Sequence, residues 1–69
     1  MFDKKRFKAY IVLAGLTMQQ VAAELGIDTA TLYRKMNGTS DFYRSEIQEL
    51  CDLLKIEDPT AVFFAQKLT

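Results

Sequence analysis

Three glycines divide the first part of this chain into short segments. Gly15 breaks a helical pattern, and Gly26 is well placed to adopt the left-handed conformation that ends a helix. Asn37-Gly38 suits a helix stop followed by a turn. Each segment between these positions has room for only one short helix. The chain is therefore expected to form several short helices, and its sequence shows no convincing strand pattern.

The starts of helices are marked as well. Thr17 to Gln20 and Ser45 to Gln48 have the form of capping boxes, in which side chains at both ends of the first turn bond free backbone groups. Asp28 is a good N-cap, and Pro59 suits the first position of a helix. These signals predict five helices, at about residues 3–14, 17–25, 28–37, 45–54 and 59–67.

A hydrophobic core follows from the spacing of apolar residues within these segments. Hydrophobic residues make up 49% of the chain, well above the content of a disordered tail. A chain of this length buries only ~60% of its unfolded surface, which leaves room for one core. We therefore predict an all-α, compact five-helix domain over residues 1–69. The expected core residues are Phe7, Ile11, Ala14, Leu16, Val21, Leu25, Leu32, Met36, Ile47, Leu50 and Leu54.

The residue types also limit the chemistry. The chain has no His, and its single Cys51 has no partner for a disulfide or a zinc site, so we expect Cys51 to be a small apolar core residue. No nucleophile has a base, and no Gly-rich phosphate loop is present, so neither an enzyme nor a cofactor is expected. No apolar run approaches the ~20 residues that span a bilayer. We expect a cytoplasmic protein without a membrane or small-molecule partner.

Charge is distributed unevenly along the chain. Nine Lys or Arg balance nine Asp or Glu, so the net charge is zero. Residues 1–45 contain seven basic and four acidic residues, whereas residues 46–69 contain two and five. A neutral total therefore does not exclude a surface that faces phosphate.

Residues 16–38, LTMQQVAAELGIDTATLYRKMNG, combine two short helices with a tight glycine-containing turn and a small Ala22 where the helices approach. That is the form of a helix-turn-helix, whose second helix reads base edges in the major groove. The order of all five helices resembles the phage Cro and repressor family. The block TLYRKMNG, followed by SDF and a late Phe-Phe, is similar to small phage-encoded regulators of Gram-positive bacteria. This resemblance implies a lambda-repressor-like domain with its helix-turn-helix at about residues 17–37.

Three positions depart from the family pattern. Many relatives have a phosphate-binding Gln directly after the Thr that starts the second helix, but this chain has Met18 there, followed by Gln19. Relatives also often pair an Arg and a Glu at the positions of Ile11 and Met36. An apolar contact is expected to replace that ion pair, and such an exchange is often neutral when both charges are removed together.

The third helix is expected to present two faces, because successive residues turn by ~100°. Leu32 and Met36 face the core, while Lys35 has a mixed position from which its ammonium group is expected to reach phosphate. The outward strip is small, hydrogen-bonding and cationic, and it matches the strip that relatives turn toward DNA. The expected base-reading residues are Thr29, Ala30, Tyr33 and Arg34, and the expected phosphate contacts are Thr17, Gln19, Lys35, Asn37 and Arg44.

A homodimer is expected, because one recognition helix contacts too few bases for useful specificity, whereas two helices can read half-sites ~34 Å apart. Adjacent Phe63 and Phe64 project ~100° apart, so both cannot easily enter one small core. We therefore expect the dimer interface at Val62, Phe63 and Phe64.

Two functions are compatible with these observations. The resemblance favours a sequence-specific transcriptional regulator that binds operator DNA, as a phage or prophage Cro-like repressor does. The alternative is a protein-interaction module that keeps the helical fold without binding DNA, for which the zero net charge, the acidic C-terminal part and Met18 are the supporting observations.

Overall fold

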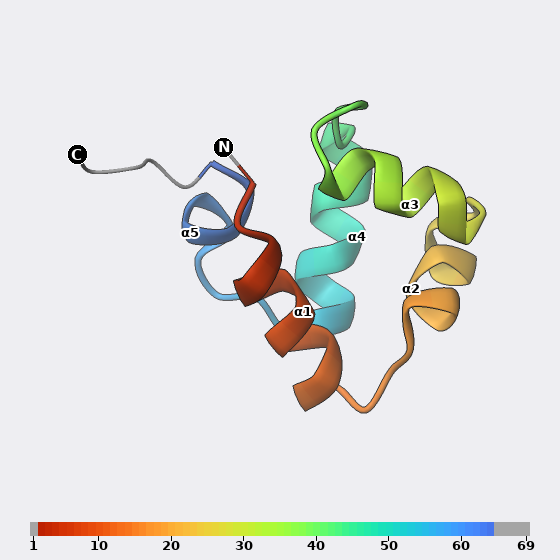
Figure 1. The fold of residues 1–69 in the computed structure, drawn as a ribbon. Coiled ribbons are helices and arrows are strands. Elements are labelled where there is room, and N and C mark those ends of the chain that lie inside the picture. The colour runs from red at the N-terminus through yellow and green to blue at the C-terminus, as the bar shows by residue number, and fades with distance from the viewer. Residues whose placement is uncertain (1, 65–69) are drawn as a thin grey trace.

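The computed structural model describes residues 2–64, which form five α-helices and no strand. The five-helix, all-α fold predicted from the sequence is confirmed over this range. In Figure 1, α4 stands between α1 and α5 on one side and α2 and α3 on the other. None of these helices is long and apolar enough to cross a membrane. The helices are α1 (Lys4–Leu13), α2 (Met18–Leu25), α3 (Thr29–Met36), α4 (Arg44–Leu54) and α5 (Pro59–Phe63).

Local signals set the starts of α2 and α3 as expected. The Thr17 hydroxyl accepts the Gln20 N–H at 3.1 Å, and the Gln20 side chain accepts the Thr17 N–H at 2.8 Å. The Asp28 carboxylate accepts the Thr31 N–H at 2.7 Å. Gly26 ends α2 with a φ of 72°, a conformation that costs glycine little. The capping predictions for α2 and α3 are therefore confirmed.

The expected start of α4 is wrong. Ser45 is not the N-cap but an exposed residue in the first turn, and the helix begins at Arg44 with Tyr43 as its N-cap. The carboxylate that accepts the Tyr43 N–H, at 2.7 Å, belongs to Glu46. Lys35 on α3 holds Glu46 there, and this tertiary contact shifts the start of the helix to Arg44.

The last helix is shorter than expected. It begins at Pro59 with the Asp58 carboxylate as its cap, as predicted, and it ends at Phe63. Lys67, the expected end, lies outside the described residues.

The predicted core is confirmed at seven positions and wrong at one. Ala14 is exposed, because it is the C-cap of α1 and lies beyond the last turn that packs inward. Leu16, Leu25 and Ile47 are half-buried against the core. The buried hydrophobic residues are Phe7, Ile11, Val21, Ala22, Leu32, Met36, Leu50, Leu54, Ile56, Val62 and Phe63.

Four phenylalanines from distant parts of the chain close the core at one end. Phe2, Phe7, Phe42 and Phe63 contact one another with ring centroids 5.1 to 6.3 Å apart. The residues before α1 also join α5 through a 2.6 Å hydrogen bond from the Asp3 N–H to the Val62 carbonyl. This cluster ties α1 and α5 to the loop between α3 and α4.

Candidate nucleic-acid interface

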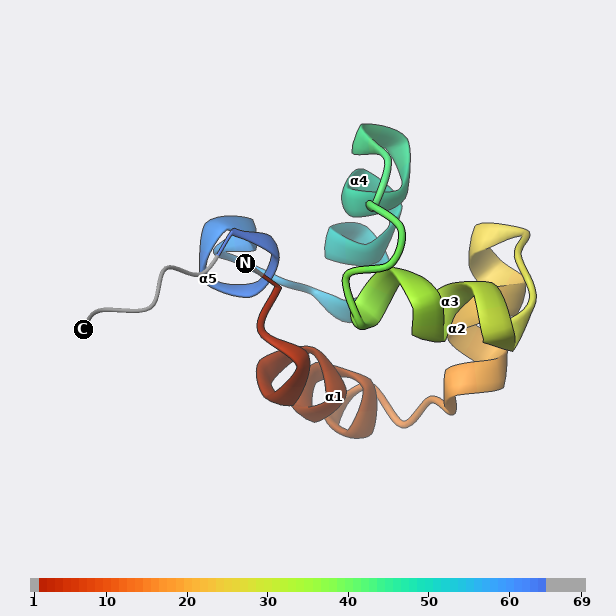
Figure 2. The same ribbon diagram turned by 45° about the horizontal axis from the view of Figure 1, so that its top comes forward.

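The α2–turn–α3 unit is held together at a small residue. Ala22 is 1% exposed, which fits the close approach of α2 and α3. After Gly26, the Ile27 N–H donates back to the Ala22 carbonyl at 3.0 Å, and the Ile27 side chain is half-buried against the core. Figure 2 looks onto α3, with α4 on one side and α1 on the other. The turn therefore leaves α3 at the surface with one side free.

The free side of α3 carries the residues expected there. Leu32 and Met36 are buried, whereas Ala30 and Arg34 are exposed and Tyr33 is 42% exposed. Thr29 is half-buried at the edge of this strip, and Asn37 is exposed at its end. The predicted division of the helix into two faces is confirmed. The DNA contacts expected of the outward face stay predictions.

Arg34 lies along the outward face and is linked to the start of α3. Its Nη2 donates to the Thr31 hydroxyl oxygen at 3.1 Å. Hydrogen bonds from the Thr31 side chain and backbone lower the pKa of Asp28, and the positive charge of Arg34 acts in the same direction. Asp28 is therefore ionised at neutral pH, and this carboxylate makes the start of α3 a poor site for phosphate. Sequence reasoning did not single out Thr31.

The start of α2 is a better place for an anion. Its capping box uses the N–H groups of Thr17 and Gln20, which leaves those of Met18 and Gln19 without intrahelical acceptors. Thr17 and Gln19 are exposed. The Met18 side chain is half-buried against the core, so the position at which relatives often place a phosphate-binding Gln is used here for packing. Backbone N–H groups at a helix start suit phosphate.

Asn37 has a partner that the sequence did not reveal. The Lys4 ammonium donates to its side-chain oxygen across 33 positions of sequence. The Asn37 side-chain nitrogen makes no hydrogen bond within the described residues and keeps its capacity to donate. The contact places a cation from α1 beside the C-terminal end of α3.

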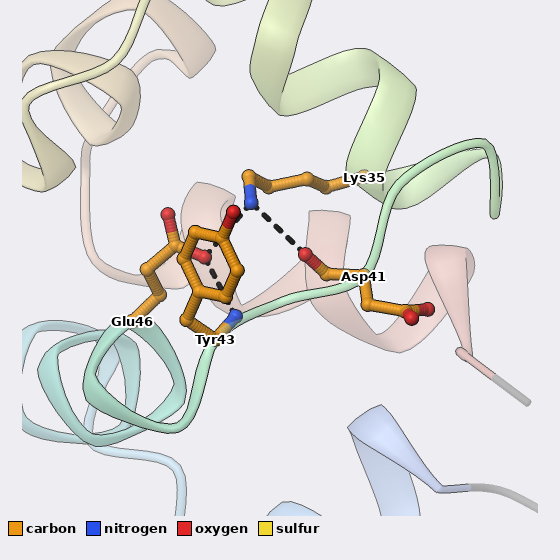
Figure 3. A network of polar contacts seen from close by, with 4 residues as sticks. All are labelled: Lys35, Asp41, Tyr43 and Glu46. Atoms are coloured by element: carbon orange, nitrogen blue, oxygen red, sulfur yellow. Dashed lines mark hydrogen bonds and ion pairs between the residues drawn. The ribbon is translucent and has the colours of Figure 1, made fainter.

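Lys35 is buried rather than directed at phosphate, which corrects the expectation for this residue. Its side chain is 5% exposed, and its Nζ lies 3.0 Å from a Glu46 carboxylate oxygen. It also donates to the Asp41 carbonyl at 2.9 Å and lies 4.2 Å from the centre of the Tyr43 ring. Figure 3 shows the ammonium group among these three partners. The reason lies in the tertiary structure, because the loop after α3 folds back and brings Glu46, in the first turn of α4, to the Lys35 ammonium group.

Arg44 is exposed at the first position of α4, directly after the loop that follows α3. With Lys35 buried, the exposed cations on or next to α3 are Arg34, Lys4 beside Asn37, and Arg44. Arg6 lies on α1 and instead pairs with Asp3 at 3.3 Å. The exposed positive charges thus come from three helices, although the whole chain is neutral.

The expected dimer residues do not share one surface. Val62 is 1% and Phe63 is 6% exposed, because both pack into the core of their own chain. Their assignment to a dimer interface is wrong for that reason. Phe64 is 56% exposed and is the one residue of the three with an apolar surface to offer.

The fold and the outward face of α3 define a helix-turn-helix protein. The family model of the Cro/C1-type HTH DNA-binding domain matches residues 6–59, and the chain belongs to this family. No curated protein and no solved structure matches the chain significantly. Family membership identifies the chain as a DNA-binding protein, which agrees with the resemblance found in its sequence.

Proposed function

We propose that the protein is a sequence-specific transcriptional regulator, a Cro-like repressor of a phage or prophage that acts by occupying an operator. The observation that carries the proposal is the outward face of α3, which presents small, hydrogen-bonding and cationic side chains while its apolar side chains are buried. A helix of this kind fits the major groove. The phage assignment rests on the similarity of TLYRKMNG and the sequence after it to small phage-encoded regulators.

Base reading is assigned to Thr29, Ala30, Tyr33 and Arg34. Among these, Arg34 offers a planar pair of donors that matches the two acceptors of guanine in the major groove. Its hydrogen bond to Thr31 is exposed and local, so binding to a base can replace it at little cost.

Contacts with the DNA phosphate backbone are assigned to exposed donors on either side of α3. Thr17 and Gln19 present the start of α2, Asn37 ends α3, and Arg44 begins α4. Lys4 joins this set because it lies beside Asn37. Contacts of this kind position a protein on the duplex without reading its sequence.

The active species is proposed to be a homodimer. Phe64 borders a shallow groove of about 740 Å³ between α4 and α5, whose lining includes Phe42, Ile47 and Cys51. An exposed aromatic side chain beside a groove lined by both apolar and charged side chains suits a self-complementary two-fold contact. Light scattering should give a dimer on a palindromic duplex, and Phe64→Ser should weaken it. A wild-type monomer on that duplex contradicts this part of the proposal.

Selection of bound sequences from a random duplex pool by the purified protein tests the function directly. We expect one preferred sequence, bound more tightly than a scrambled duplex, and an affinity that falls linearly on a log–log plot against salt. If the protein shows no salt-dependent or sequence-dependent binding to DNA, the result would instead favour a protein-interaction module on this fold.

Substitutions of Arg34 and of Arg44 should weaken DNA binding in different ways. Arg34→Ala is expected to cost ~1–3 kcal/mol on the preferred duplex and to remove the preference at one base position. Arg44→Ala should weaken preferred and scrambled duplexes equally and reduce the salt slope by about one. Binding isotherms at several salt concentrations measure both effects. An unchanged ratio of preferred to scrambled affinity in Arg34→Ala would remove that residue from the base readers.

A further inference from the structure

Two of the three N–H donors of Lys35 are hydrogen-bonded inside the protein, and an aromatic ring covers the ammonium group. An ammonium group has three N–H donors. Here one donates to Glu46 and one to the Asp41 carbonyl, and the face of the Tyr43 ring covers the cation. Direct binding of phosphate would require leaving these partners, at the cost of a buried, unpaired Glu46 carboxylate. Any effect of Lys35 on DNA must therefore act through other residues.

Glu46 is the central group of this network. Its oxygen Oε1 accepts from Lys35 at 3.0 Å and from the Tyr43 N–H at 2.7 Å, so one atom joins the end of α3 to the start of α4. Lys35 also binds the loop itself through the Asp41 carbonyl. The path of the chain between the two helices is thus set by one cation and one carboxylate (Figure 3).

Arg44 lies inside the segment that this network holds. It directly follows Tyr43 and precedes Glu46 by two positions in the first turn of α4. An unpaired Glu46 would add a negative charge beside a surface proposed to face phosphate, and it would leave the α4 start free to move. Lys35 prevents both effects, because it neutralises the carboxylate and fixes its position.

We propose that Lys35 is a positioning residue for DNA binding, which neutralises the Glu46 carboxylate so that this side chain stays on the Tyr43 N–H and holds Arg44 in place at the start of α4. The proposal rests on the proposed function, because it requires that Arg44 contacts a DNA phosphate. It replaces a direct phosphate contact by Lys35 with an indirect one.

The test compares Lys35→Met with Lys35→Met/Glu46→Gln on the duplex selected from the random pool, over a range of salt concentrations. Met keeps the apolar stem, and Gln keeps an acceptor for the Tyr43 N–H. The single variant should bind about tenfold more weakly with a salt slope lower by about one. The double variant should return to within about threefold of wild type and recover the slope. Circular dichroism verifies that both variants are helical at the temperature used.

Arg44→Ala in each background separates positioning from folding. It should reduce the salt slope by about one in wild type and in the double variant, and by nearly nothing in Lys35→Met, where its contact is already lost. A role of Lys35 in stability alone would leave the effect of Arg44→Ala the same in all three. An equal effect of Arg44→Ala on the salt slope in all three proteins, measured where each is folded, would overturn the proposal.

Two further outcomes would also overturn it. A double variant that stays weak with a reduced slope shows that Lys35 itself meets phosphate, and this comparison holds even if the single variant does not fold. A folded Lys35→Met that binds as wild type shows that the network has no part in binding. If wild type itself binds no duplex in a salt-dependent way, the proposed function fails, and the inference that rests on it fails with it.

Discussion

The starts of α2 and α4 use the same local hydrogen bond in different surroundings. In both, the side chain three positions into the helix accepts the N–H of the N-cap residue, at 2.8 Å for Gln20 and 2.7 Å for Glu46. The α2 cap is exposed and involves only residues 17–20. In the α4 cap, the Glu46 carboxylate is buried, charged and bound to Lys35 on another helix.

The difference separates two functions of a helix cap. An exposed cap with neutral partners stabilises its own helix, and water replaces lost hydrogen bonds cheaply. A buried cap with a charged partner joins two helices, and the loss of one partner leaves the other charge without a counterion. The α2 start can therefore tolerate change that the α4 start cannot.

Removing the cation from the α4 start should have the largest effect. Lys35→Met leaves the Glu46 carboxylate buried without a counterion and should lower the free energy of unfolding by about 3–5 kcal/mol. Adding Glu46→Gln removes the second charge and should recover most of the loss. Urea unfolding followed by circular dichroism measures both. A loss below about 1 kcal/mol in the single variant would make this cap equivalent to the exposed one.

Exchanging amide and carboxylate at the two matched positions should give opposite results. Glu46→Gln keeps an acceptor for the Tyr43 N–H but leaves the Lys35 ammonium unpaired, so we expect a loss of about 1.5–3 kcal/mol. Gln20→Glu places a charge in the exposed first turn of α2, where the helix dipole favours it by about 0.3–1 kcal/mol. The two variants are compared by the same unfolding measurement. Equal effects would show that burial does not distinguish the two caps.

Removing the exposed cap should have a moderate effect. Thr17→Ala loses the acceptor for the Gln20 N–H and is expected to cost about 1 kcal/mol of unfolding free energy. Thr17→Ser keeps a hydroxyl at the same position and is the control, with little change expected. If Thr17→Ala destabilised the protein as much as Lys35→Met does, the exposed cap would also be a tertiary contact.

The start of α3 adds a cap that is exposed but charged, and its effect should depend on pH. Hydrogen bonds from Thr31 lower the pKa of Asp28, so its ionised form stabilises the folded state at neutral pH. This contribution is present above the ordinary pKa of the group and is lost as the pH falls through the lowered value, below about pH 4. Asp28→Asn retains a cap without the charge. The difference in urea midpoint between wild type and Asp28→Asn should therefore be small at pH 7 and shrink on acidification; a difference that grew would reverse the assigned sign.

Much of the helix-turn-helix was predictable because its determinants are close together in sequence. The Thr17 and Asp28 caps act over three positions, and Gly26 needs only its own conformational freedom. The faces of α3 follow from helical periodicity, which placed Arg34 outside and Leu32 inside. The family resemblance then supplied the DNA-binding role, and the family match to residues 6–59 agrees with it.

The error at Phe63 arose from the tertiary surroundings of α5. Phe63 was expected at an interface, but Phe2, Phe7 and Phe42 surround it, and Phe2 and Phe42 were not expected in the core. A five-residue helix such as α5 has too few turns for its periodicity to indicate which side is buried.

By itself, the sequence determined where α2 and α3 begin, which side of α3 faces outward and the family to which the chain belongs. Each of these depends on residues within a few positions of one another or on a pattern along one helix. Only the tertiary structure decided the surroundings of Lys35 and Asn37, whose partners Glu46 and Lys4 lie 11 and 33 positions away. A lysine at the edge of a helix face can extend into water or turn inward, and that choice depends on whether a distant carboxylate is brought within reach.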